Sequence, residues 1–262
     1  MRPKRHLGQN FLIDRNVARK IIACLDPQPG ERVLEIGPGR GALSGLLHQS
    51  GAELIAVERD AALASALARD FPGCSLIVAD GLTIDWKRLN GRVDKVIGNL
   101  PYNIASPLLW DMLPCLDRAQ GLVFTVQKEV ARRIVSSPGS KAYGALSVWL
   151  QSFAEIRYEF EIGPQVFRPR PRVDSAVVSM RPYPKDRRVQ DERMLAELIH
   201  RCFQQRRKQL KTILKSWWNA GLDRWLAKEG LSRQARPEIL SPEQFARMAA
   251  LVKRGKQGEN SD

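Results

Sequence analysis

Glu35-Ile36-Gly37-Pro38-Gly39-Arg40-Gly41 forms a glycine-rich stretch that directly follows the apolar pair Val33-Leu34. Glycine lets the backbone come close to a ligand at positions where a side chain would collide with it. A glycine-rich turn between a first strand and a first helix is typical of enzymes that bind nucleotide cofactors, including the dinucleotide enzymes. The turn alone therefore predicts a nucleotide-type ligand and leaves its identity open.

Short apolar runs recur through the first part of the chain and alternate with helix-like segments. We expect strands at residues 33–36, 54–57, 76–78, 95–97 and 122–126, and helices at residues 42–49, 61–70, 105–113 and 128–135. This alternation predicts an α/β fold with a mostly parallel sheet that helices cover on both faces. Two later runs, at residues 156–162 and 175–181, lie closer together and are expected to pair as an antiparallel edge of the same sheet.

A proline-containing stretch, Arg181-Pro182-Tyr183-Pro184-Lys185-Asp186, interrupts this pattern and predicts a linker. Helical periodicity dominates beyond it, and Ser241-Pro242-Glu243-Gln244 predicts a helix start with a capping serine and a capping-box glutamine. We therefore expect a cofactor-binding catalytic domain over residues 1–183 and a small, all-helical C-terminal domain over residues 184–262.

The chain is strongly basic, with a formal net charge of +14 over 262 residues. From Lys185 onward there are 18 Lys and Arg residues against 10 Asp and Glu residues, so the C-terminal part is the more basic per residue. A charge of this size favours a polyanionic partner such as nucleic acid, although a merely soluble basic protein has the same composition.

Cysteine and histidine residues are scattered singly, without the close pairs of a zinc site or a redox motif. They are Cys24, Cys74, Cys115 and Cys202, and His6, His48 and His200. We expect reduced thiols in a cytoplasmic protein and no metal site. There is also no apolar run of membrane-spanning length and no signal-peptide pattern, so we expect no membrane partner.

Three carboxylates stand at successive predicted strand ends. Glu58 ends the second strand, where an acid accepts hydrogen bonds from ribose hydroxyls, as it would for NAD as well. Asp80 ends the third strand and is placed to accept an adenine amino group. Glu35 is a poor neighbour for a pyrophosphate but suits a cofactor that carries an ammonium and a sulfonium. Singly, each resembles an ordinary solvated acid; together they favour a site for a cationic nucleotide cofactor.

Asn99-Leu100-Pro101-Tyr102 follows the fourth predicted strand. Adenine N6 is a poor nucleophile, and acceptance of both its protons by the Asn99 side-chain oxygen and the Leu100 carbonyl would aim its lone pair at a methyl group. Pro101 stiffens the turn, and Tyr102 offers a face for an extruded base. Such a tetrapeptide is often only a turn. Its position one strand after the cofactor signature favours catalysis, mainly by alignment.

With these motifs, nearly the whole chain resembles the ribosomal RNA adenine N6,N6-dimethyltransferases, most closely those that act on bacterial small-subunit (16S) RNA. The motifs are Leu7-Gly8-Gln9-Asn10-Phe11-Leu12, Glu35-Ile36-Gly37-Pro38-Gly39, Asn99-Leu100-Pro101-Tyr102-Asn103 and Val166-Phe167-Arg168-Pro169-Arg170-Pro171-Arg172-Val173-Asp174-Ser175. The resemblance implies a Rossmann-like S-adenosylmethionine methyltransferase sheet followed by a basic helical domain. Ala105 departs from the family, which usually has a hydroxyl residue there.

The resemblance also implies roles for individual residues. Tyr102 and Phe167 would sandwich the flipped adenine, beside the catalytic Asn99-Leu100-Pro101 turn. The residues expected to contact S-adenosylmethionine are Gln9, Asn10, Leu12, Gly37, Gly39, Glu58, Asp80 and Asn99. Those expected to contact RNA are Arg168, Arg170, Arg172, Arg206, Arg207, Lys208 and Lys211, although a solvated helix face would explain the last four nearly as well.

The function expected from this resemblance is dimethylation of N6 of two adjacent adenosines in the 3'-terminal hairpin loop of small-subunit RNA. The partner would be the assembling small ribosomal subunit, and the enzyme would act as a monomer. Two alternatives stay open: an enzyme for large-subunit RNA or DNA adenine, and a ribosome-assembly factor whose methylation is incidental.

Overall fold

The computed structural model describes residue 4 and residues 7–258, the last six of these as backbone only. Within this part of the chain, seven strands form one sheet in the order β4-β3-β2-β5-β6-β9-β7. Their bounds are β2 Arg32–Ile36, β3 Glu53–Glu58, β4 Ser75–Val78, β5 Lys95–Asn99, β6 Gly121–Gln127, β7 Ala154–Ile162 and β9 Ser175–Pro182. The first five strands in this order are parallel, and β9 and β7 form an antiparallel edge. The expected fold class is confirmed.

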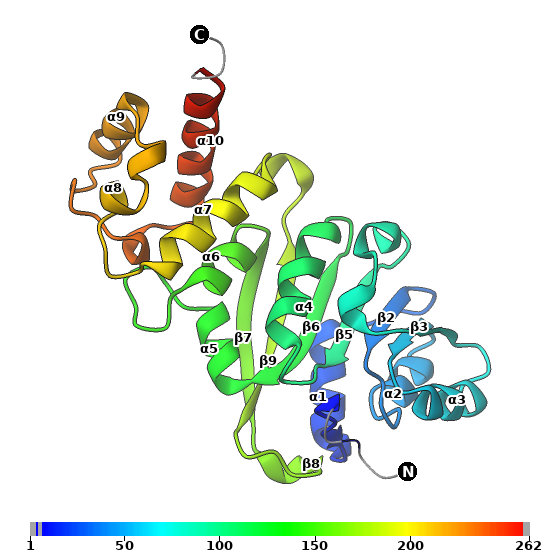
Figure 1. Cartoon of the computed structure of the whole chain (residues 1–262). Helices are drawn as coiled ribbons and strands as arrows, with labels where there is room; N and C mark the ends of the chain where they lie inside the picture. The colour runs from blue at the N-terminus through cyan, green and yellow to red at the C-terminus, as the bar shows by residue number, and fades with distance from the viewer. Residues whose placement is uncertain (1–3, 5–6, 259–262) are drawn as a thin grey trace. The chain divides into compact units, whose positions relative to one another are not determined.

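Helices flank this sheet and connect its strands (Figure 1). They are α1 Arg15–Leu25, α2 Ser44–Gln49, α3 Ala61–Asp70, α4 Ala105–Met112 and α5 Lys128–Ile134, with short 3-10 turns that include η2 Gly81–Thr83 and η5 Pro164–Val166. Ile97 and Val123 belong to one core cluster with Ile21 of α1. Since side chains alternate along a strand, their buried neighbours Val96 and Leu122 face the opposite side of the sheet. Parallel strands buried on both faces place their carboxyl ends together, at one edge.

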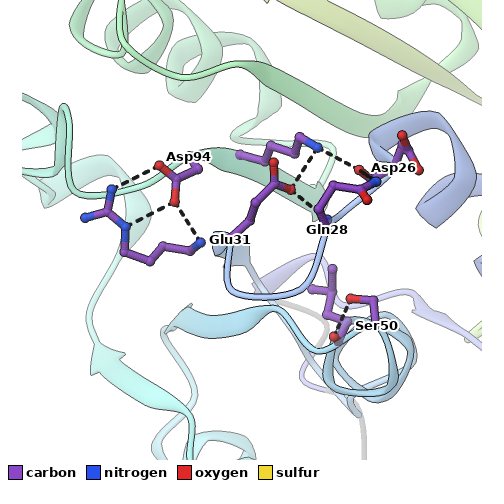
Figure 2. Close-up of polar contacts among 8 residues, drawn as sticks. Asp26, Gln28, Glu31, Ser50 and Asp94 are labelled. Atoms are coloured by element: carbon purple, nitrogen blue, oxygen red, sulfur yellow. Dashed lines mark hydrogen bonds and ion pairs between the residues drawn. The ribbon is translucent and has the colours of Figure 1, made fainter.

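A network of polar side chains lies at the amino ends of the parallel strands, opposite the carboxyl edge of the sheet (Figure 2). The Lys95 ammonium donates to the backbone carbonyl of Asp26 over 2.6 Å and pairs with Glu31 over 2.8 Å. Arg32 pairs with Asp94 over 3.0 Å. Lys95 is almost completely buried, and these contacts compensate its desolvation. The network joins the end of α1 to the starts of β2 and β5.

A separate two-stranded sheet pairs β1 (Phe11–Leu12) with β8 (Phe167–Arg168), antiparallel. Leu12 lies opposite Phe167, and both side chains are buried in the same core cluster as α1. Strands of two residues carry no sequence signal of their own, and neither was expected. Their pairing holds the N-terminal segment against a stretch more than 150 residues later in the chain.

The chain divides into two compact units, residues 1–132 with 154–185, and residues 133–153 with 186–262. The second unit contains α6 Ala145–Gln151, α7 Glu192–Gln204, α8 Leu210–Ile213, α9 Ala220–Lys228 and α10 Pro242–Gly258, with the 3-10 turns η7 Lys215–Trp217 and η8 Pro237–Ile239. The expected domains, residues 1–183 and 184–262, stay a prediction. The two units differ from them in the placement of residues 133–153, which belong to the second unit.

The physical reason lies in the packing of α6. Its residues are buried almost without interruption from Leu146 to Leu150, and it contacts α7 and α10. The Tyr143 hydroxyl, just before α6, donates to the Leu240 carbonyl over 2.7 Å. The capping pattern at the start of α10 is as expected, since Gln244 and Ser241 exchange side-chain to backbone hydrogen bonds.

Candidate active site

A cavity opens at the carboxyl edge of the parallel strands. Five segments line it: residues 7–11, residues 36, 37 and 39, and residues 57–59, 79–81 and 99–104, together with Leu63. Each segment except the first follows or ends a strand, in line with the rule that ligands of open α/β sheets bind at this edge. Twelve residues were predicted to bind cofactor or to act in catalysis, and all of them except Leu12 and Phe167 line this cavity.

The glycine-rich turn adopts the left-handed conformation at Gly37 (φ 68°) and at Gly39 (φ 58°). A Cβ atom at Gly39 would lie 2.9 Å from the Phe11 ring, so a side chain would displace this part of the N-terminal segment. The Gly39 amide donates to Glu58 over 3.1 Å. Glycine is therefore required here both for backbone conformation and for space.

Glu58 is nearly buried, and burial raises the pKa of its carboxyl group. One carboxylate oxygen accepts from the Gly39 amide and the other from the Asp60 amide, over 2.8 Å. Glu58 thus holds the glycine turn in place while it lines the cavity. The expected ribose acceptor is an oriented group, whose remaining acceptor capacity is available to a ligand.

Glu35 is 1% exposed and lines a small adjoining cavity with Gly37 and Asn99. Burial raises the pKa of its carboxyl group to about 7, against the opposing effect of a 2.6 Å hydrogen bond from the Ser44 hydroxyl. A buried acid in this position favours a neighbouring positive charge over a phosphate.

Asp80 is the N-cap residue of η2, and both of its carboxylate oxygens are bonded. Oδ1 accepts from the Leu82 amide over 3.0 Å, and Oδ2 pairs with Arg59 over 3.1 Å. Arg59 also lines the cavity and is exposed. The carboxylate is therefore fixed at the edge of the cavity, where Oδ2 retains a lone pair for a second donor.

Asn99 ends β5, and its side-chain amide donates to the backbone carbonyl of Asn10 over 2.9 Å. Because a carbonyl only accepts, this bond assigns the amide nitrogen to Asn10 and leaves the side-chain oxygen as an acceptor. The preceding Gly98 has no room for a side chain, since a Cβ would lie 2.7 Å from the Ile36 carbonyl oxygen. Leu100 is held by a 3.1 Å bond from its amide to the Thr125 carbonyl.

The two predicted aromatic partners of adenine differ in position. Tyr102 is half-buried, lines the cavity, and its hydroxyl lies 2.5 Å from that of Ser175. Phe167 is completely buried and packs in the core, outside the lining of the cavity. Along β8 the side chains alternate, so Phe167 faces inward while Arg168 is exposed. The structure does not bring Phe167 and Tyr102 together around the cavity.

The N-terminal strap, residues 7–11, is tied down at Asp60. The Gln9 side-chain amide donates to Asp60 over 3.2 Å, and the Lys4 ammonium pairs with the same carboxylate oxygen over 2.9 Å. Asp60 also caps α3 through the Ala62 amide. Asp60 and Ser175 received no role from the sequence, because their partners are distant and neither shows a local signal.

The residues predicted to contact RNA fall into two groups. Arg168 at the end of β8 is exposed, and so are Arg170 and Arg172 between β8 and β9. Arg207, Lys208 and Lys211 are exposed in the second unit. Arg206 differs from them: its guanidinium donates to Glu238 over 2.6 Å and to the carbonyls of Lys141 and Ser140. These bonds stabilise the second unit and occupy Arg206 within it.

In the described part of the chain, no helix is long and apolar enough to cross a membrane. Among the same residues, no three His, Cys, Asp or Glu side chains lie together as a group that could hold a metal ion.

Comparison with known proteins agrees with this geometry. The family model described as ribosomal RNA adenine dimethylase matches residues 1–254. The proteins named ribosomal RNA small subunit methyltransferase A from Maridesulfovibrio salexigens and Oleidesulfovibrio alaskensis are 46% and 47% identical to the chain, over 96% of its length and 96% and 91% of theirs. A crystal structure of a dimethyladenosine transferase from Plasmodium falciparum superposes with a TM-score of 0.76 at 22% identity, covering 95% of this chain and 98% of that one. The chain belongs to the ribosomal RNA adenine dimethylase family.

Proposed function

We propose that the chain transfers two methyl groups to N6 of each of two adjacent adenosines in the 3'-terminal hairpin loop of small-subunit (16S) ribosomal RNA. Membership of the family makes it an S-adenosylmethionine-dependent methyltransferase of ribosomal RNA adenine. The choice of the small subunit is supported by the two relatives above, which share nearly half of its residues over almost their whole length.

The observation that carries the proposal is the orientation of Asn99. Its amide nitrogen is engaged by Asn10, so its oxygen is free to accept one N6 proton of an extruded adenine. The backbone carbonyl of Leu100, in the next residue, is the acceptor for the other. An amine held by two fixed acceptors presents its lone pair in one direction, which raises the rate by alignment. A monomethylated amine still has one proton to donate, so the same site serves the second transfer.

The residues around the cavity fit S-adenosylmethionine better than a dinucleotide. At Gly39 the glycine turn lies so close to the Phe11 ring that a side chain would not fit, and Glu35 is a buried acid beside the turn. Glu58 would hold the ribose, Asp80 the adenine amine, and Gln9, Asn10 and the glycine turn the methionine part. When bound, the cofactor supplies a methyl group on a sulfonium. Proton loss from the methylated nitrogen needs no strong base, so water can accept it.

Tyr102 is the proposed platform for the extruded base. Phe167 remains a predicted second partner, and it would have to leave the core to serve as one. The exposed arginines Arg168, Arg170 and Arg172 and the basic residues of the second unit would bind RNA phosphates. We further propose that the enzyme acts as a monomer in the cytoplasm on the assembling small subunit, and so contributes to ribosome biogenesis.

The test is transfer from labelled S-adenosylmethionine to unmethylated small subunits, to large-subunit RNA and to DNA, with the products identified by nucleoside mass spectrometry. Dimethyladenosine confined to small-subunit RNA is the expected result, and label on the other substrates would contradict it. Asn99→Ala should abolish transfer and leave RNA binding intact. If cofactor binds and no substrate is labelled, the result would favour the alternative that the chain is a ribosome-assembly factor.

A further inference from the structure

Tyr102 and Ser175 are 73 residues apart in sequence, yet their hydroxyl oxygens lie 2.5 Å apart. Ser175 is completely buried and does not line the cavity, whereas the half-buried Tyr102 does. Either hydroxyl can donate, and the bond satisfies a polar group of Ser175 that would otherwise be buried without a partner. The contact therefore joins a residue of the site to one behind it.

The two residues stand on elements of different rigidity. Tyr102 belongs to a turn after β5, closed by a 3.1 Å bond from the Ile104 amide to the Pro101 carbonyl. The orientation of a tyrosine ring is set by two side-chain torsions, and burial of one side of the ring restricts them only in part. A hydrogen bond at the hydroxyl fixes the position of the far end of the ring and so the first torsion. Because a phenolic hydroxyl prefers partners near the plane of the ring, the bond also restricts the second torsion, which sets the ring plane.

Ser175 is the first residue of β9, paired with Gln127 of β6 and Ile162 of β7. The preceding residue, Asp174, is also held: its carbonyl accepts from the Lys128 amide over 3.0 Å, and its carboxylate lies 3.5 Å from the Lys128 ammonium. Ser175 is thus part of the sheet and not of the loop that carries the exposed arginines. Sites supported by strands are held more rigidly than sites supported by loops.

We propose that Ser175 is a positioning residue, whose hydroxyl fixes the ring of Tyr102 in the orientation on which the target adenine stacks. The inference deepens the proposed function and rests on it, because it takes Tyr102 as the stacking platform. Neither the sequence motifs nor the family resemblance gave Ser175 a role. The proposal predicts that the Tyr102 hydroxyl affects methyl transfer only through its bond to Ser175, while stacking of the adenine depends on the Tyr102 ring.

The kinetic test compares Ser175→Ala, Tyr102→Phe and the double variant on small subunits. Each single variant should lower kcat about 3- to 10-fold, the range that the loss of one hydrogen bond gives. KM for the cofactor should not change, because Ser175 does not line the cavity. The double variant should be no slower than the slower single one, since both changes remove the same bond.

A spectroscopic test needs neither cofactor nor RNA. The chain has four tyrosines, so protein labelled at the tyrosine Cζ carbon gives few NMR signals, and Tyr102→Phe assigns one of them. Ser175→Ala should shift that signal and leave the other three in place. An unmoved Tyr102 signal would overturn the proposed contact, and this readout separates a local effect on Tyr102 from a general loss of structure.

Ser147→Ala is the matched control. Ser147 is also a completely buried serine, and its hydroxyl donates to the Arg133 carbonyl, all within the second unit. This variant should lower the melting temperature as much as Ser175→Ala does, without lowering kcat. Multiplicative losses in the double variant, or an unchanged kcat in folded Ser175→Ala, would overturn the positioning role. Absence of transfer by the unsubstituted chain would instead contradict the proposed function.

Discussion

The side-chain amide of Asn99 donates a 2.9 Å hydrogen bond to the backbone carbonyl of Asn10 and so joins the end of β5 to the N-terminal strap. Asn99 lines both the main cavity and the small one beside Glu35. The proposed acceptor for adenine N6 is therefore oriented by a segment that itself lines the main cavity.

Asn99→Asp tests this orientation more sharply than a truncation. A carboxylate has no proton for the Asn10 carbonyl, and the two oxygens repel each other. We expect transfer to fall about 100-fold or more, the scale for loss of one oriented group in an active site, and cofactor affinity to weaken as well. Isothermal titration with cofactor and initial rates measure the two effects. Unchanged cofactor affinity would show that the bond to Asn10 does not hold the strap.

The contacts of Asp60 with Lys4 and Gln9 are expected to hold the N-terminal strap and so to affect how tightly cofactor binds. Asp60→Asn removes the ion pair with Lys4 but keeps the cap of α3, because Asn caps helices as well as Asp does. Cofactor should dissociate faster, with the dissociation constant about 2- to 5-fold higher, the upper part of the range for a partly exposed ion pair. Stopped-flow displacement measures the rate.

The control for this effect is Lys4→Ala. Lys4 is about half exposed, so its change should be smaller than that of Asp60→Asn, and the double variant should be no worse than Asp60→Asn alone. Additive effects would mean that Lys4 and Asp60 do not act as a pair.

Glu35 predicts a pH dependence of stability. Burial raises the pKa of its carboxyl group to about 7 in the folded chain, above the value of about 4.3 for an exposed Glu. Between these values the unfolded chain has lost the proton and the folded chain still holds it, so stability falls as pH rises through this window. Above pH 7 the loss of stability levels off at about 4 kcal/mol at most.

Glu35→Gln removes the titrating group and keeps an acceptor for Ser44. In the absence of cofactor the variant should melt higher than the parent at pH 8 and level with it at pH 4. Thermal melts across pH 4–8 measure this difference. A constant difference at every pH would contradict the raised pKa. Cofactor should narrow the gap at pH 8, because its ammonium stabilises the carboxylate of the parent.

The sequence was a good guide to the sheet and to the residues near its carboxyl edge. Strand bounds follow from apolar runs that local periodicity detects, and strands of a parallel sheet place their ends together. Helix α6 was not predicted from the sequence, because it is short and buried on nearly all sides and so its residues show no polar face. The contact of Tyr102 with Ser175 could not be predicted either, because it depends on the register of β9 against β6, which no local pattern encodes.

Arg206 shows the same limit among the basic residues. Charge and helical spacing placed it in one cluster with Arg207, Lys208 and Lys211, yet its guanidinium is bonded to Glu238 and two carbonyls. A side chain that is already bonded in this way has few donors left for a phosphate. We therefore expect Arg206 to act through stability and Arg207 to act through RNA.

Arg206→Ala and Arg207→Ala are a matched pair of adjacent substitutions that remove the same charge. Arg206→Ala should cost about 2 kcal/mol, since it breaks a hydrogen-bonded ion pair that is one-third exposed. Arg207→Ala should leave the melting temperature nearly unchanged, as exposed substitutions do within about 0.5 kcal/mol. It should weaken RNA binding and reduce the slope of log affinity against log salt by about 1. Thermal melts and RNA titrations at several salt concentrations decide the point. Arg206→Ala could instead melt like the parent and lower the slope of log affinity against log salt. That result would mean that Arg206 leaves Glu238 to bind RNA, and it would contradict the structural role given to Arg206.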